Sequence, residues 1–72
     1  MVDLPLTELD AFAAVAQERS FRAAAKLRGV SASSLSDAVR RLEERLEVRL
    51  LNRTTRNVSL TEAGARLLER LR

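Results

Sequence analysis

The stretch AKLRGVSASSLSDAV, from Ala25 to Val39, decides the fold. It has the parts of two helices joined by a tight turn: a small residue where the helices cross, then a glycine where the chain reverses. Ala25 suits the crossing and Gly29 the reversal, and Val30 is expected to fill the elbow. Leu35 and Val39 are expected to hold the second of these helices against its neighbours. The spacing therefore predicts a helix-turn-helix.

Apolar residues at helical spacing predict two helices up to this turn. The first is expected from about Thr7 to Arg19, with Thr7 as its N-cap. Ser20 is expected to cap the second, Phe21 to about Arg28, which ends at the C′ glycine Gly29. The expected inward residues are Leu9, Phe12, Ala13 and Ala16 in the first helix and Phe21, Ala24, Ala25 and Leu27 in the second.

After the turn, a third helix is expected from Ala32 to about Glu47, capped by Ser31. Its inward residues are expected to be Leu35, Val39, Leu42 and Leu46. The helical spacing of apolar residues then ends. Two short β-type segments, 48–53 and 57–60, lie on either side of a polar centre and indicate a β-hairpin. Thr61 is expected to cap a last helix, with an apolar stripe of Ala63, Leu67, Leu68 and Leu71.

The charge of the 72 residues is concentrated in the middle of the chain. The net charge is +3, but the segment 20–61 holds nine bases and four acids. A basic centre suggests a polyanionic partner, although solvated helix faces give similar counts. With no histidine, no cysteine and no glycine-rich phosphate loop, we expect no enzyme activity, no metal and no cofactor. The absence of cysteine fits the cytoplasm, and neither a signal peptide nor a membrane helix is expected.

Four serines lie within six residues at the start of the third helix. A helix in the major groove of DNA presents its first turns to the bases, and short side chains with hydroxyls allow close approach there. We interpret Ser33, Ser34, Ser36 and Asp37 as candidate base contacts, and Arg40 and Arg41 as phosphate or base contacts. Ser31 is expected to be a cap that also reaches a phosphate.

Each of these residues has a plainer interpretation. The serines could serve only as caps and exposed residues, and Arg40 and Arg41 could pair with acids on the same helix. A carboxylate near phosphates is unfavourable unless it accepts from cytosine or pairs with an arginine, and Arg41 is the expected partner of Asp37.

The hairpin offers a second contact surface. Arg53 and Arg56 flank Thr54 and Thr55 at its tip. An arginine there would suit a narrow minor groove in A·T-rich sequence, and the threonine hydroxyls would suit phosphates. The alternative is a polar hairpin end that has no partner.

Five ordered motifs make nearly the whole chain, from about Leu6 to Arg72, resemble the N-terminal DNA-binding domain of LysR-type transcriptional regulators. They are SFxxAA from Ser20, SxxxLS from Ser31, the RxLE segment of Arg40 or Arg41 with Leu42 and Glu43, LLNRTTR from Leu50 and VSLTEAG from Val58.

The resemblance implies a mainly α, winged helix-turn-helix domain of three helices, a two-stranded hairpin wing and the start of a linker helix. It places the third helix, about 32–47, in the major groove and the wing, about 50–60, in the minor groove of a partly palindromic, A·T-containing site. The matching positions are Ala32, Ser33, Ser34, Ser36, Asp37 and Arg53.

The chain departs from the family pattern at three positions. Arg19 and Glu47 stand where glycine is usual, which could alter one turn and either lengthen or strain the exit of the third helix. Leu51 stands where phenylalanine is usual. Its smaller side chain is a loss of volume that the core must accommodate.

The resemblance divides the chain into a DNA-binding domain, 1–60, and the start of a linker helix, 61–72. An effector domain would follow, so we expect a fragment whose stripe of Leu67, Leu68 and Leu71 is exposed. We expect the linker to form a homodimer in the full-length protein, weakly or not at all in this fragment. The competing interpretation is a winged-helix protein-interaction module that does not bind DNA.

Overall fold

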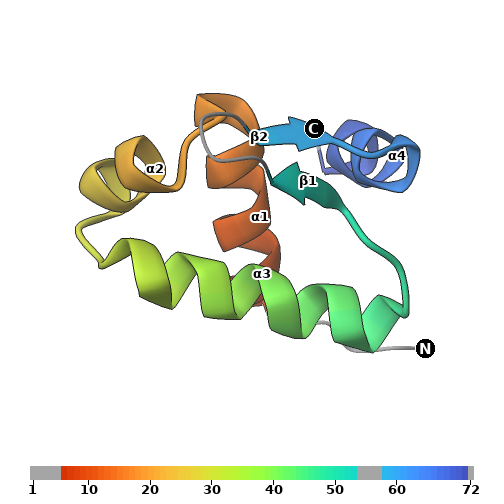
Figure 1. Cartoon of the computed structure of the whole chain (residues 1–72), viewed down its shortest axis with the longest axis horizontal. Helices are drawn as coiled ribbons and strands as arrows, with labels where there is room; N and C mark the ends of the chain where they lie inside the picture. The colour runs from red at the N-terminus through yellow and green to blue at the C-terminus, as the bar shows by residue number, and fades with distance from the viewer. Residues whose placement is uncertain (1–5, 54–57, 72) are drawn as a thin grey trace.

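The computed structural model describes residues 6–53 and 58–71 and has the predicted architecture, mainly helical with a two-stranded hairpin (Figure 1). The elements are α1 (Leu6–Glu18), α2 (Phe21–Arg28), α3 (Ala32–Leu46), β1 (Leu51–Arg53), β2 (Val58–Leu60) and α4 (Glu62–Arg70).

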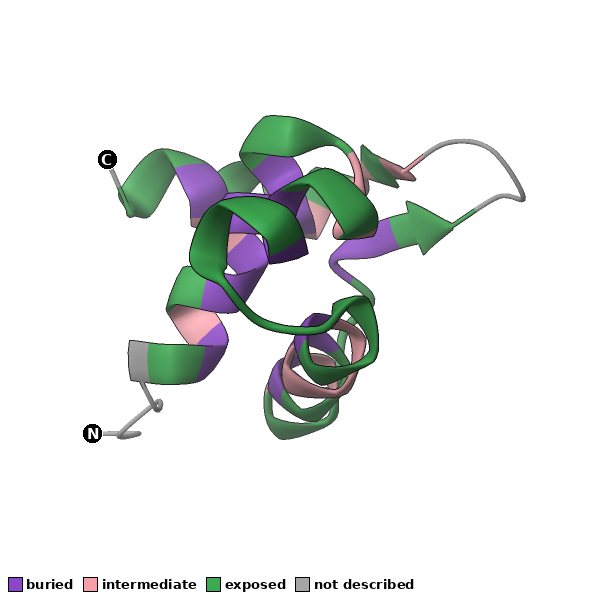
Figure 2. Cartoon of the chain, turned by 90° about the vertical axis from the view of Figure 1, so that its left-hand side faces the viewer, coloured by how far each residue is buried: buried purple, intermediate pink, exposed green. Residues whose placement is uncertain are grey.

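Helix α1 is the centre of the fold and packs against α2, α3 and β2. Most of its apolar residues are buried, Phe12 and Val15 completely, and Figure 2 shows the buried positions where the helices face one another. The predicted stripe of α1 is confirmed, with Leu9 and Ala13 half-buried. The predicted cap Thr7 is wrong, because the helix already includes Leu6 and Thr7 lies inside its first turn.

The backbone of α2 and of the turn before α3 has the predicted cap and the predicted glycine conformation. The Ser20 side chain accepts from the backbone N–H of Ala23, and Gly29 takes the left-handed conformation at φ 70°. Glycine has no Cβ to clash there. The backbone N–H of Val30 donates to the carbonyl of Ala25 at 3.0 Å, which closes the turn.

Two predicted core residues of this region are instead exposed, Leu27 at 67% and Val30 at 47%. Ala24 and Ala25 face the core, and Leu27 lies about 200° around the helix from Ala25. Backbone hydrogen bonds close the elbow, so no side chain is needed to fill it. The expectations for Leu27 and Val30 are therefore wrong.

Helix α3 buries Leu35, Val39 and Leu42 as predicted and ends at Leu46. The next residue, Glu47, takes the left-handed conformation at φ 55°, and Arg19 between α1 and α2 does the same at φ 54°. This conformation costs a residue with a Cβ about 1–2 kcal/mol. The expected strain at the exit of α3 is present, and the helix is not lengthened.

The hairpin is antiparallel, with Leu51 opposite Leu60 and Arg53 opposite Val58. Thr61 caps α4 as predicted, accepting from the backbone N–H of Gly64. Gly64 lies so close to the residue before β1 that a Cβ would overlap the carbonyl oxygen of Leu50. This close approach fixes α4 against the start of the hairpin.

The expected exposed stripe on α4 is wrong in part. Leu68 is buried at 9% exposure and belongs to the core, and Leu67 is half-buried against it. Only Leu71 of the three is exposed, because α4 folds back onto β2. Within the described residues, no helix has the length and apolar character needed to cross a bilayer.

Candidate nucleic-acid interface

The N-terminal end of α3 carries an exposed group of short side chains. Ser31 caps the helix by accepting from the backbone N–H of Ser34 at 3.1 Å, and its own hydroxyl donates to Oγ of Ser34 at 2.8 Å. Ala32, Ser33 and Ser34 are all exposed. No bulky side chain therefore separates this end of the helix backbone from a ligand, and free backbone N–H groups favour an anion there.

Asp37 pairs with Arg40, whose Nη2 lies 2.7 Å from its Oδ1. The predicted partner, Arg41, is wrong; positions three and four residues apart are both neighbours on a helix, and Arg40 makes the contact. Half-exposed pairs such as this contribute little to stability. The pairing does offset the negative charge of Asp37 on the surface that also carries Ser33 and Arg41.

The side chain of Arg53 is turned toward the helices. Its Nη1 donates to Oγ of Ser36 at 3.0 Å, and its Cζ lies 4.7 Å from the centroid of the Phe21 ring. The structure thus brings together the wing residue Arg53 and the α3 residue Ser36, which the sequence assigned to separate contacts. The other predicted wing residues, Thr54, Thr55 and Arg56, lie outside the described residues.

Glu43 holds the start of the hairpin, a role that the sequence did not reveal. Its Oε2 accepts from the backbone N–H groups of Leu50 at 2.8 Å and Leu51 at 3.2 Å. Because Glu43 lies about two helical turns beyond Ser36, the two residues share one face of α3. Helix α3 therefore contacts the β1 region at two points, through Ser36 and through Glu43.

Two further ion pairs connect the helices and were also missed. Arg45 Nε lies 3.0 Å from Oε1 of the buried Glu8, and Arg28 Nη2 lies 3.0 Å from Oδ1 of Asp10. The sequence shows the charges of these residues but not their pairing, because the two partners of each pair lie on different helices. Arg28 and Arg45 thus have partners on another helix, whereas Arg40 pairs with Asp37 of its own helix.

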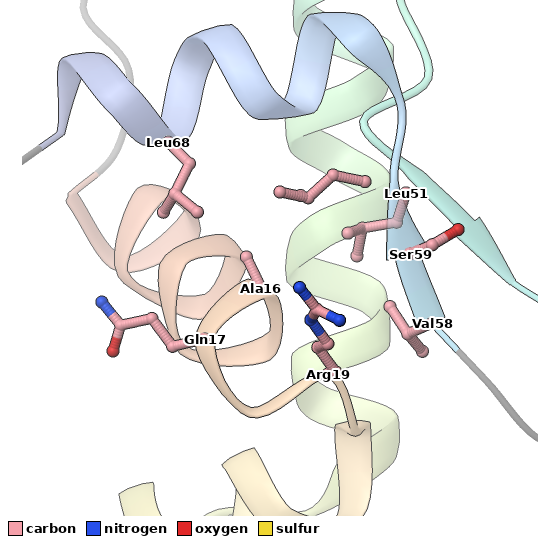
Figure 3. A pocket seen from close by; sticks show the side chains of 8 residues that line it. Ala16, Gln17, Arg19, Leu51, Val58, Ser59 and Leu68 are labelled. Carbon is pink, nitrogen blue, oxygen red and sulfur yellow. The ribbon is translucent and has the colours of Figure 1, made fainter.

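A separate pocket of about 560 Å³ lies among α1, the hairpin and α4 (Figure 3). Its lining includes Ala16, Leu51 and Leu68, and the Arg19 side chain extends toward it. The pocket lies beside Leu51, which is itself completely buried. In the part of the chain that the structure describes, no group of acidic, histidine or cysteine residues is arranged to hold a metal ion.

The comparisons with known proteins agree on one family. Residues 6–65 match the family described as bacterial regulatory helix-turn-helix proteins, lysR family. The uncharacterized HTH-type transcriptional regulator YcaN of Escherichia coli is 54% identical over 67 residues, covering 93% of this chain and 22% of that protein. The regulator PgrR of the same species is 56% identical over 63 residues, covering 88% and 21%. The chain thus spans about a fifth of the length of these relatives.

Solved structures show the same likeness. The DNA-binding domain of CbnR in complex with DNA has a TM-score of 0.89 and 38% identity, over 92% of this chain and 76% of that one. The BenM DNA-binding domain with catB site 1 DNA has a TM-score of 0.88 and 35% identity, over 92% and 73%.

Proposed function

Because this chain belongs to the LysR family of bacterial regulatory helix-turn-helix proteins, we propose that it binds double-stranded DNA sequence-specifically as the DNA-binding part of a transcriptional regulator. The observation that carries the proposal is the bare N-terminal end of α3, with Arg53 beside it. The solved DNA complexes of CbnR and BenM support it, since both have this fold.

In this proposal α3 enters the major groove, which is about 12 Å wide and accepts a helix about 10–12 Å across. The residues that reach bases or phosphates are Ser31, Ala32, Ser33, Ser34, Ser36, Asp37, Arg40 and Arg41. The exposed Ser33 and Ser34 can approach base edges closely, while Arg41 contacts a phosphate. Asp37 remains paired with Arg40 or accepts from a cytosine amino group.

The hairpin forms the wing and contacts the adjacent minor groove. Arg53, Thr54, Thr55 and Arg56 are the proposed contacts, with arginine favoured where an A·T tract narrows the groove. Glu43 supports the wing by holding the backbone of Leu50 and Leu51 to α3. The spacing between α3 and the wing, the two proposed DNA contacts, is then fixed by contacts within the domain.

The whole protein is proposed to be a cytoplasmic homodimer without enzyme activity that pairs through α4 and reads a partly palindromic, A·T-containing site. The relatives' names describe regulators and no enzymes. In the 72-residue chain the dimer is weak or absent, because burial of Leu68 in the core leaves Leu71, the C-cap of α4, as the exposed leucine of the stripe.

A salt titration tests the proposal. Duplexes are selected from a random pool with the wild-type chain, and the dissociation constant is measured by fluorescence anisotropy at several salt concentrations. If three to five phosphates are neutralised, affinity falls about 40- to 500-fold between about 50 and 200 mM salt. A scrambled duplex provides the control for specificity. Affinity that is independent of salt and equal for both duplexes would contradict DNA recognition and favour a protein-interaction module.

A further inference from the structure

The guanidinium of Arg53 is held between two different helices. Its carbon lies 4.7 Å from the centroid of the Phe21 ring, and its Nη1 donates to the Ser36 hydroxyl at 3.0 Å. Phe21 is the first residue of α2, Ser36 lies in the second turn of α3, and Arg53 ends β1. One side chain of the hairpin therefore contacts both helices of the helix-turn-helix.

The two phenylalanines of the chain have different surroundings. Phe12 is completely buried in the core, whereas Phe21 is half-buried and lies beneath the exposed Arg53. A cation within about 6 Å of a ring centroid is attracted to its π face. Part of the Phe21 ring thus packs on the core, and part is available to bind a cation.

Among the described residues, the contacts of Arg53 use few of its donors. A guanidinium has five N–H groups, and the bond to Ser36 uses one. A long side chain that is already ordered loses less conformational entropy when it binds, and this raises affinity.

We propose that Phe21 is a positioning residue for DNA binding: together with the Ser36 hydroxyl, its ring holds the Arg53 guanidinium at the junction of wing and α3 before DNA arrives. This inference rests on the proposed function, because it concerns how Arg53 is presented to DNA. It assigns to Phe21 a role beyond packing.

The test is a double-mutant cycle on the 72-residue chain with the selected duplex. Phe21→Leu keeps an apolar side chain and removes the π face, and we expect affinity to fall about two- to fivefold. Phe21→Tyr keeps the ring and is expected to bind as wild type. In the Arg53→Ala background, Phe21→Leu is expected to have no further effect on affinity. Thermal unfolding of every variant shows whether it is folded at the assay temperature.

Two measurements separate positioning from packing. In the DNA-free chain, the Phe21 ring should shift the Arg53 Cδ proton resonances upfield, and Phe21→Leu should abolish that shift. Leu9→Ala, which truncates a half-buried residue of α1, is the packing control and should leave affinity unchanged when folded. The slope of affinity against salt should be the same for Phe21→Leu as for wild type, because the charge of Arg53 remains.

Several outcomes would overturn the inference. If Phe21→Leu binds as tightly as wild type while Arg53→Ala binds more weakly, Phe21 does not position Arg53. If the loss from Phe21→Leu persists in the Arg53→Ala background, the ring acts through packing alone. Failure of the wild-type chain to bind any duplex would overturn the proposed function as well, and of the outcomes of this cycle only that one would do so.

Discussion

The two ends of α3 are built in different ways. At the N-terminal end, Ser31 caps the helix, and the following residues are short and exposed. At the C-terminal end, Glu43 binds two backbone N–H groups next to β1, and Arg45 pairs with the buried Glu8. The exposed side chains of the first turn bond to one another, whereas Glu43 and Arg45 join α3 to the hairpin and to α1.

This difference separates recognition from stability along a single helix. Substitutions at the N-terminal end remove few intramolecular contacts, so residues there can vary with the DNA sequence to be bound. Substitutions at the C-terminal end disturb the joint that holds the wing. We expect the first group to change affinity with little loss of stability, and the second to change both.

The largest effect is expected on the buried face of α3, on which both ends depend. Leu42 is completely buried, and Leu42→Ala should lower the free energy of unfolding by about 2–5 kcal/mol by removing contacts and leaving a cavity. Urea denaturation measures the change. Arg41→Ala, one residue away and exposed, is the control and should stay within about 0.5 kcal/mol of wild type. Equal midpoints for Leu42→Ala and wild type would show that this face of α3 is wrongly assigned.

At the C-terminal end, Glu43→Ala should lower the free energy of unfolding by about 1–3 kcal/mol, because the N–H groups of Leu50 and Leu51 lose their acceptor. Hydrogen exchange at these two amides should accelerate, and DNA affinity should fall with it. Glu44→Ala removes the same charge from an exposed neighbour and is the matched control. Glu43→Gln keeps an acceptor oxygen and should recover most of the loss. If Glu43→Ala and Glu44→Ala behaved alike, the two ends of α3 would not differ as described.

The parts of the fold that the sequence predicted well depend on local chemistry. The bounds of α2, the caps Ser20, Ser31 and Thr61, and the left-handed Gly29 follow from a few neighbouring residues. The hairpin was predicted from a change of period, and its strands are shorter than the runs that indicated it.

What could not be predicted depends on how distant segments meet. Nothing in the sequence around Glu43 indicates that its carboxylate accepts from the backbone N–H groups seven and eight residues later. The direction of Arg53 depends on the packing of α2 against α3, which places Phe21 and Ser36 near one another. Leu27 is apolar yet exposed, because it lies about 200° around α2 from the buried Ala25.

At the N-terminal end, Ser33→Ala should lower DNA affinity by about 0.5–1.5 kcal/mol, the usual net value of one hydrogen bond. The free energy of unfolding of Ser33→Ala should differ from wild type by less than about 0.5 kcal/mol, because Ser33 is exposed and the cap is made by Ser31. Anisotropy and thermal unfolding on the same samples separate the two quantities. Thr7→Ala, which removes an exposed hydroxyl from α1, should change neither. A loss of stability without loss of affinity in Ser33→Ala would reverse the roles given to the two ends.

The smallest effect is a gain at the exit of α3. Glu47 is exposed and left-handed at φ 55°, so Glu47→Gly should raise the free energy of unfolding by about 0.5–1 kcal/mol by relieving this strain. Loss of a carboxylate at the negative end of the helix dipole acts in the same direction. Glu44→Gly, three residues earlier inside α3, is the matched control and should lower stability by about 1 kcal/mol. The melting temperature of a domain of this size shifts by about 4–8 °C per kcal/mol, so the opposite signs are measurable. If both glycines lower the melting temperature, Glu47 stabilises the C-terminal end through its side chain, and the exit of α3 is not strained.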